Sequence, residues 1–346
     1  VEMPERPAGT VEDRAQEQGP GFVMRAVTRP EYGGPEVVTV EDVARPSPGP
    51  GEVLVRVGAA GLDRATLHLL TGLPLMARLA FGVRRPKRPV LGQQVAGVVE
   101  EVGPGVDGLA VGDRVCGTAA GSFAQYAVAK AGTLAPTPDG VEDRHAATIG
   151  VSGVTALAAV VEHARVQRGD RVLVLGASGA VGGYAVQLAA HLGADVTGVC
   201  SASKEDLVRA QGAHRTVDYA SVRLPAMGGP FDVIIDIAGN NPVSALRRCL
   251  APGGRLVIVG GEGGGRLLGG IERNLLATMA GWLTAKDLGW MFSSTTTARC
   301  AEVARLITEG AVTPVIDRTV DLDGAADAIA AMASGHLRGH AVLEMQ

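Results

Sequence analysis

Residues 172–183 read VLVLGASGAVGG, a short apolar run that gives way abruptly to glycine, alanine and serine. The apolar run ends at Leu175, and the amphipathic, Ala-rich segment VGGYAVQLAAHLG follows from Val181. A buried strand that turns directly into a helix through small residues is typical of a βαβ unit. The chain is therefore expected to contain a parallel sheet with helices on both of its faces.

The rhythm of the sequence changes near residue 147. Before it, short strands are separated by glycine and proline, which predicts an antiparallel, barrel-like β domain over 24–146. After it, strands alternate with helices, which predicts an α/β, doubly wound parallel sheet over 147–285. Residues 286–346 are expected to return and complete the first domain. Residues 1–23, which lack a basic region followed by an apolar one, are expected to be a disordered extension without a secretory signal.

The small residues of the turn match a binding fingerprint. Ala177, Gly179 and Gly182 occupy the three positions of G-x-G-x-x-G, with alanine in the first. The pattern lets the backbone approach a pyrophosphate, and the helix N-terminus offers its free N–H groups to the phosphates. The alternative is a glycine-rich turn without a ligand. The strand before the turn and the helix after it favour a dinucleotide site.

The end of the second strand indicates which dinucleotide binds. The strand DVTGVC runs into Ser201, Ala202, Ser203 and Lys204, with no carboxylate at its end. An NAD site usually places an acidic residue here for the ribose hydroxyls, whereas hydroxyls and an ammonium group suit a 2′-phosphate. These residues favour NADP(H). In the alternative interpretation, Ser203 and Asp206 form a capping box and Lys204 is solvated.

Charge, cysteine usage and hydropathy exclude several classes of function. The chain has 32 basic and 36 acidic residues, a net charge of -4, and no long basic stripe, which disfavours nucleic acid as a partner. Its 4 cysteines form no CxxC pair, which disfavours a zinc knuckle or a disulfide scaffold and fits a reducing cytoplasm. The longest apolar stretch, residues 146–161, is short and contains polar residues, so no membrane partner is expected.

Several ordered motifs after residue 24 carry a family resemblance: PGPGEVLVRVGAAG, LGQQVAGVVEEVGPGV, GLAVGDRVCG, GSFAQYAVA, VSGVTAL, GASGAVGGYAVQLAAHLGA and GHLRGHAVL. Together they resemble the zinc-independent quinone oxidoreductase branch of the medium-chain dehydrogenase/reductase superfamily. The resemblance implies a GroES-like catalytic domain beside a Rossmann domain, with NADPH between them. It also implies a homodimer in which two Rossmann sheets join edge to edge.

The resemblance assigns roles to individual residues. It implies that the fingerprint turn holds the pyrophosphate, that a second group surrounds the 2′-phosphate, that a third lies near the nicotinamide, and that a C-terminal arginine reaches the cofactor. In that order the residues are Ser178, Gly179, Ala180 and Val181; Ser201, Lys204 and Tyr219; Thr155, Gly260 and Gly261; and Arg338.

The chain departs from its relatives at three places. Zinc-dependent relatives carry a cysteine after the AAG turn and a Gly-His-Glu segment, whereas here Leu62 follows Gly61 and the segment reads Gly92-Gln93-Gln94. No catalytic metal is therefore expected. Many relatives read Asn-Pro-x-Asp where this chain has 63–66, DRAT, so a carboxylate replaces an asparagine near the reacting groups. Gln94 stands where an aspartate is usual, a change that could be structural.

Three residues are candidates for the chemistry. The hydroxyl of Thr155 could stabilise a developing oxyanion, and Asp63 or His68 could relay a proton. Asp63 could equally be the N-cap of the helix that follows it, and a surface or packing role for His68 is favoured. Nearby, RRPKRP at 84–89 is expected to be a solvated loop, with a basic rim for an anionic substrate as the alternative. Residues 72–83 suggest an aliphatic pocket wall.

Three functions remain open at this point. The first is an NADPH-dependent reductase of a small hydrophobic quinone or α,β-unsaturated carbonyl, or a carbonyl or alcohol redox enzyme on the same scaffold. The second is a pathway enzyme that uses the pocket for a step without redox chemistry. The third is a protein that binds NADPH without catalysis. The same fold hosts all three, so the distinction depends on the site.

Overall fold

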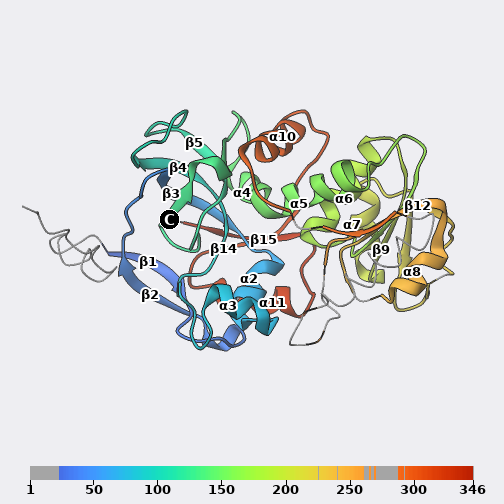
Figure 1. The fold of residues 1–346 in the computed structure, drawn as a ribbon, viewed down its shortest axis with the longest axis horizontal. Coiled ribbons are helices and arrows are strands. Elements are labelled where there is room, and N and C mark those ends of the chain that lie inside the picture. The colour runs from blue at the N-terminus through green and yellow to red at the C-terminus, as the bar shows by residue number, and fades with distance from the viewer. Residues whose placement is uncertain are drawn as a thin grey trace, which may run out of the picture.

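The structure is a computed structural model that describes residues 23–224, 226–239, 241–260, 265, 269, 287–291 and 293–345. Within them the chain forms one large antiparallel-based sheet, one parallel sheet and a small two-stranded sheet. Figure 1 shows the two large sheets in separate halves of an elongated molecule, with α4 and α5 between them. The predicted α/β class, with a barrel-like domain beside a doubly wound sheet, is confirmed.

The parallel sheet has six strands in the order β10-β9-β8-β11-β12-β13. Their bounds are β8 (Arg171–Leu175), β9 (Asp195–Cys200), β10 (Arg215–Asp218), β11 (Phe231–Asp236), β12 (Leu250–Ile258) and β13 (Asp287–Trp290). Its helices include α6 (Ala180–His191), α7 (Glu205–Ala210) and α8 (Val243–Cys249), and the short η6 (Ala202–Lys204) precedes α7. The strand order reverses between β8 and β11, the point at which such sheets bind ligands.

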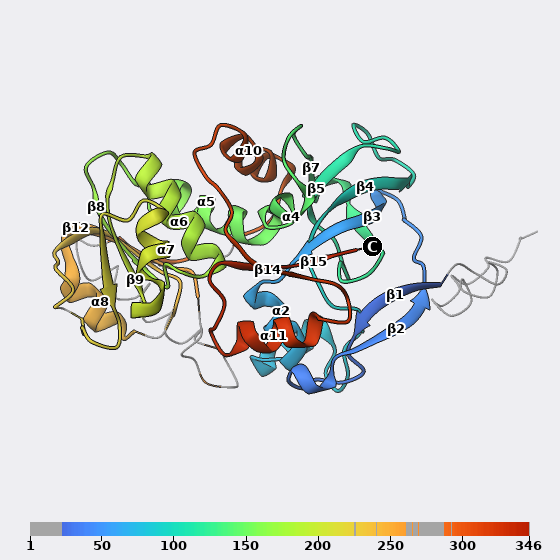
Figure 2. The ribbon, with the colours of Figure 1, turned by 180° about the vertical axis from the view of Figure 1, so that it is seen from behind.

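The other large sheet has the order β14-β15-β3-β4-β5-β7, and β6 pairs with β3. Its strands are β3 (Glu52–Gly61), β4 (Gln94–Val102), β5 (Arg114–Thr118), β6 (Tyr126–Lys130), β7 (Leu134–Pro136), β14 (Ile316–Val320) and β15 (His340–Glu344). The small sheet pairs β1 (Val23–Thr28) with β2 (Thr39–Ala44). Helices α2 (Arg64–Thr71), η2 (Leu75–Ala77), α3 (Arg78–Phe81) and α11 (Ala325–Ala333) lie beside this half (Figure 2).

The two halves are continuous in places where the sequence predicts a boundary. One helix spans residues 143–163, across the predicted boundary at 146/147, and consists of α4 (Asp143–Ala146), η4 (Ile149–Gly153), α5 (Val154–Leu157) and η5 (Ala158–His163). This helix is long and apolar enough to cross a membrane, but 72% of its most apolar window is buried inside the fold, as in a core helix.

The return to the first sheet begins later than residue 286. Residues 287–290 form β13, which pairs in parallel with β12 and so extends the parallel sheet. Beyond β13, α10 (Thr297–Thr308) packs on α5 and β7, and only β14 and β15 join the first sheet. Val23, placed by the sequence in the extension, is already part of β1, and residues 1–22 lie outside the described residues.

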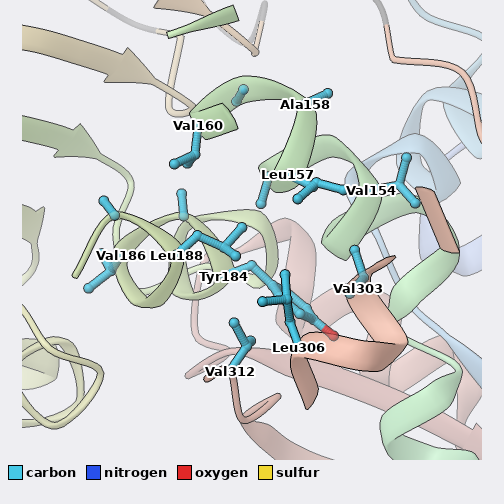
Figure 3. Close-up of a cluster of buried hydrophobic side chains, with 14 of the residues drawn as sticks. Val154, Leu157, Ala158, Val160, Tyr184, Val186, Leu188, Val303, Leu306 and Val312 are labelled. Carbon is cyan, nitrogen blue, oxygen red and sulfur yellow. The ribbon is translucent and has the colours of Figure 1, made fainter. Parts of the chain in front are cut away.

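Helix 143–163, α6 and α10 share a core beside the parallel sheet (Figure 3). Leu157 and Val160 come from the first, Tyr184 from α6, and Val303 from α10. Tyr184 is fully buried, and its hydroxyl lies 2.6 Å from Thr148 Oγ1. Because these apolar faces are packed on one another, α5 and α6 are held in fixed positions relative to each other.

Candidate active site

The fingerprint turn connects β8 to α6. Gly176 has a φ of +87°, and a Cβ on Gly182 would lie 2.0 Å from Gly176 O, so both positions require glycine. Gly179 is the N-cap residue of α6 and provides no side-chain cap. Residues 178–181 keep part of their surface exposed, whereas most of α6 is buried. The turn therefore presents an uncapped helix N-terminus to solvent, which fits a pyrophosphate.

Beyond β9 lie the residues predicted to surround a 2′-phosphate. Ser201 follows the strand, with its Oγ 3.3 Å from Ser203 Oγ, and the backbone N–H of Tyr219 donates to Cys200 O at 3.2 Å. The Tyr219 side chain is exposed. Neither η6 nor α7 has a side-chain cap, so the alternative capping box of Ser203 and Asp206 does not form.

Two cations, Lys204 after β9 and Arg338 before β15, each contact the half of the molecule opposite their own. Lys204 Nζ donates to the carbonyl oxygens of Gly335 and Leu337, each at 2.7 Å. In return, Arg338 donates to both carboxylate oxygens of Asp206, at 2.9 and 2.8 Å, and to Ser203 O at 2.9 Å. We call these reciprocal contacts the Lys204–Arg338 clasp. Burial lowers the pKa of Lys204, and the hydrogen bonds from Arg338 lower the pKa of Asp206.

The segment that carries Arg338 also touches the fingerprint turn. Gly339 N donates to Ser178 O at 3.1 Å, and Gly179 and Gly339 form an isolated parallel bridge. The residues predicted to hold the phosphates of a dinucleotide therefore lie where the two halves of the chain meet. The structure brings together Ser178, Gly179, Lys204 and Arg338, as the sequence predicts for one binding site.

Thr155 and Gly260 are the described residues that the sequence predicts near the nicotinamide. Thr155 is the one residue of 152–160 that is partly exposed rather than buried. Gly260 N donates to Asp236 O at 3.3 Å, and a Cβ on Gly260 would lie 2.0 Å from Ile237 O. This close approach of the chains after β11 and β12 requires glycine. Gly261, the remaining residue predicted here, lies outside the described residues.

Asp63 is the N-cap of α2, as one of the two interpretations of the sequence predicts. Its Oδ1 accepts from Thr66 N at 2.9 Å and from Thr66 Oγ1 at 3.3 Å. Its Oδ2 is buried and has no hydrogen-bond partner in the part of the chain that the structure describes. Burial raises the pKa of Asp63 to about 6, against the lowering effect of the hydrogen bonds from Thr66. The carboxyl group therefore titrates close to neutral pH.

His68 lies on the exposed side of the same helix. Its Nδ1 is 3.0 Å from Leu73 O. Among the described residues no hydrogen bond joins His68 to Asp63 or Thr155. This position agrees with the surface role that the sequence favours.

Gln94 has structural contacts, which the sequence allows for without naming its partners. Its Oε1 accepts from the backbone N–H groups of Val151 and Ser152, at 3.0 and 3.1 Å, on the π-helical turn η4. Gln94 Nε2 and Ser152 Oγ are buried and, like Asp63 Oδ2, lack a partner among the described residues. Gln94 thus fixes the turn that precedes Thr155. The one signal in the sequence was the glutamine at a position where an aspartate is usual.

The described residues offer no cluster of side chains suited to a zinc ion. Within the described residues no group of three or more histidine, cysteine, aspartate or glutamate side chains is arranged to hold a metal. The cysteines, Cys116, Cys200, Cys249 and Cys300, form no disulfide and are all buried. Burial raises the pKa of the Cys116 thiol to about 11 and that of Cys300 to about 12, so both are neutral thiols in the folded protein.

Known proteins share these features. Family models match residues 49–139 as an alcohol dehydrogenase GroES-like domain and residues 211–343 as a zinc-binding dehydrogenase. Quinone oxidoreductase of Rattus norvegicus is 33% identical over 321 residues, 88% of this chain and 93% of that protein. Two sheets of these topologies, with a dinucleotide fingerprint between them, define a two-domain nicotinamide-dependent oxidoreductase.

Solved structures agree with this class. A quinone oxidoreductase from Coxiella burnetii superimposes with a TM-score of 0.82 at 25% identity, covering 94% of this chain and all of that one. A mycobacterial protein complexed with NADPH superimposes with a TM-score of 0.77 at 28% identity, covering 93% of this chain and 100% of that one. The chain belongs to the quinone oxidoreductase-like branch of the medium-chain dehydrogenase/reductase superfamily.

Proposed function

We propose that this protein is an NADPH-dependent reductase that transfers hydride, without a catalytic metal, to a quinone or another α,β-unsaturated carbonyl compound. The observation that carries the choice of cofactor is the pair of cations, Lys204 and Arg338, beside Ser201 at the end of β9. No carboxylate directly follows this strand. Cationic donors of this kind suit the oxygens of a 2′-phosphate. When bound, NADPH supplies the hydride.

The residues near the nicotinamide end would position the acceptor and stabilise the charge that develops on its oxygen. Thr155 can donate its hydroxyl from a rigid helix whose neighbouring residues are buried. Asp63, with a pKa of about 6, holds its proton on a fraction of molecules near neutral pH and can deliver it to a reduced oxygen. His68 is the alternative proton relay, although it is exposed and lies against Leu73 O.

The proposal extends to assembly and location. Among the described residues, β13 is an edge strand of the parallel sheet, and a homodimer formed by pairing two copies there is the assembly that the family resemblance implies. The 4 free, buried cysteines suit a reducing cytoplasm. Light scattering of the purified protein would measure its mass directly, and a monomer at all concentrations would contradict the dimer.

The first experiment is fluorescence titration with NADPH and with NADH, on the protein and on Lys204→Ala. We expect tighter binding of NADPH, and a loss of roughly tenfold or more in Lys204→Ala for NADPH but little change for NADH. Lys130→Ala, at an exposed lysine that ends β6, is the matched control. Equal affinity for the two cofactors in the unaltered protein would contradict the choice of NADPH.

The second experiment measures oxidation of bound NADPH when quinones and enones are added. Oxidation that depends on the acceptor supports the reductase. We expect Thr155→Val to lower kcat by about ten- to a hundredfold with little change in cofactor affinity, because it removes a donor but keeps the shape of the side chain. Binding of NADPH without oxidation by any acceptor would favour a step without redox chemistry, or a protein that binds NADPH without catalysis.

A further inference from the structure

The chain contains a long basic region with no acidic residue. Residues 64–99 carry six basic residues, Arg64, Arg78, Arg84, Arg85, Lys87 and Arg88, and neither aspartate nor glutamate. The whole chain has 32 basic and 36 acidic residues, so the remainder has 26 and 36, a net charge of -10. Positive charge is therefore concentrated in one segment of an otherwise acidic protein.

The same segment exposes large apolar side chains. The described residues include ten exposed large hydrophobic side chains, and half of them lie in one stretch of nine residues: Leu75, Met76, Leu79, Phe81 and Val83. Leu79 is 67% exposed and Val83 is 64% exposed. Single exposed apolar residues are common on protein surfaces, but a group of them marks an interaction surface.

Polar contacts explain why these side chains face outward. Arg78, which begins α3, points inward. Its guanidinium lies 4.3 Å from the ring centroid of Tyr32, and its Nε donates to Gly72 O at 3.0 Å. The hydroxyl of Tyr32 donates to Gly82 O at 2.7 Å. The inner face of η2 and α3 is thus attached to the body of the protein by Arg78 and Tyr32. Their apolar residues are left on the outer face.

A tight turn places the basic residues beside the apolar ones. Gly82 has a φ of +120°, and a Cβ there would lie 2.0 Å from Arg85 O. After the turn, Lys87 N donates to Phe81 O at 2.8 Å, so the chain folds back onto the end of α3. The side chains of Arg84, Arg85, Lys87 and Arg88 are exposed, and the described residues provide no ion-pair partner for any of the four.

We propose that residues 75–88 form a docking surface for the anionic face of a phospholipid bilayer. The apolar side chains would enter the boundary between headgroups and acyl chains, while the four cations bind the headgroup phosphates and carboxylates. The contact is peripheral and involves no membrane-spanning helix. It does not depend on the proposed redox function. A second copy of the chain is disfavoured because two such surfaces would repel, and exposed apolar residues are not needed to bind a nucleic acid.

The test is co-sedimentation of the full chain with vesicles of phosphatidylcholine, alone or mixed with phosphatidylserine. We expect binding only to the anionic vesicles, weakened by salt. The charge variant Arg84→Gln/Arg85→Gln/Lys87→Gln/Arg88→Gln should lower the partition coefficient roughly a hundredfold. The apolar variant Leu79→Ser/Val83→Ser should lower it about tenfold, because it removes apolar surface that would be buried in the bilayer. Both side chains are exposed to water in the free protein, so the variant should fold normally.

Matched controls separate this surface from the rest of the protein. Lys130→Gln/Arg223→Gln and Val111→Ser alter exposed residues of the same types elsewhere and should bind like the unaltered chain. Absence of binding to anionic vesicles, or equal loss in the controls, would overturn the proposal. It would also be overturned by soluble polyglutamate binding as tightly as vesicles regardless of Leu79 and Val83. A change of oligomeric state in the apolar variant would instead identify a contact between copies.

Discussion

At the scale of single residues, two buried titratable groups respond to pH in opposite directions. Asp63 is buried and its pKa is raised to about 6, so the folded protein binds its proton more tightly than the unfolded chain does. His340 is buried and its pKa is lowered to about 3, so the folded protein resists protonation there. As pH falls from above 6 toward 3, protonation of Asp63 increases the free energy of unfolding, whereas the resistance of His340 to protonation decreases it.

The variant Asp63→Asn isolates the first of these effects. Asparagine retains an oxygen that can cap α2 but has no charge to bury. With a shift from 3.8 to about 6, the variant should gain stability over the unaltered protein as pH rises from about 4 to above 6, by up to about 3 kcal/mol. Urea unfolding at several pH values measures the difference. A difference that does not vary with pH would contradict the raised pKa.

The variant His340→Gln should change stability with pH in the opposite direction to Asp63→Asn in the same unfolding measurement. Here the unaltered protein should lose stability relative to the variant as pH falls from the usual histidine value of 6.5 toward about 3. The ring of His340 packs edge-on against Tyr184, with centroids 5.7 Å apart, so the variant also carries a packing cost that is independent of pH. Only the slope with pH is therefore diagnostic, and a slope of the same sign as for Asp63→Asn would contradict the assignment.

At the scale of secondary structure elements, the contact between Gln94 and helix 143–163 shows how a strand stabilises an irregular helix. A π-helical turn shifts the backbone hydrogen-bond pattern, and in this structure two N–H groups of the turn bond to the Gln94 side chain. Turns of this kind are often found at functional sites, and Thr155 lies two residues beyond the end of this one. The position of Thr155 in the helix therefore depends on Gln94, a residue of strand β4.

Replacing Gln94 with leucine tests that dependence. Gln94→Leu leaves the buried N–H of Ser152 and the part-buried N–H of Val151 without their acceptor, which should lower the free energy of unfolding by about 2–4 kcal/mol. Gln125→Leu is the matched control, because its half-buried Oε1 accepts only from Arg25 N. We expect kcat to fall in Gln94→Leu as Thr155 moves. If Gln94→Leu lost no more stability than the control, Gln94 would not hold the helix.

Local patterns made some features of these elements predictable. The fingerprint turn could be predicted because strand, glycines and helix are adjacent in the chain, and Asp63 could be proposed as an N-cap because its partner Thr66 is three residues away. The partners of Gln94 are 57 and 58 residues distant, and those of Arg338 are 132 and 135. No periodicity or spacing encodes such contacts. The continuous helix across 146/147 was missed for a related reason, since a change of composition does not require a break in the backbone.

At the scale of the whole molecule, the Lys204–Arg338 clasp joins the two halves at the cofactor site. Its cations are engaged by Asp206 and by backbone carbonyls. A 2′-phosphate carries a charge of about -1.5 to -2, so it would compete with the Asp206 carboxylate for Arg338. We therefore expect the preference for NADPH to depend on an acidic residue as well as on the cations.

The variant Asp206→Asn tests this competition. Removing the carboxylate should raise affinity for NADPH about three- to tenfold and leave affinity for NADH unchanged, because exposed charges are partly screened. Asp323→Asn, at an exposed carboxylate paired with Arg25 away from this site, is the control. Lower affinity of Asp206→Asn for NADPH would instead mean that Asp206 positions Arg338 for the phosphate.

The position of β15 has a consequence for biosynthesis. This strand pairs with β3 and β14 within the first sheet, and Ala341, Val342 and Leu343 are completely buried there. A ribosome releases β3 long before β15, and the whole parallel sheet emerges between them. The parallel sheet is formed by one contiguous segment of chain and can fold as it emerges. The first sheet cannot be completed until β15 is made, so the edge of β3 that pairs with β15 stays unpaired until then. A nascent chain of this protein should therefore need protection from aggregation until its final strand is made.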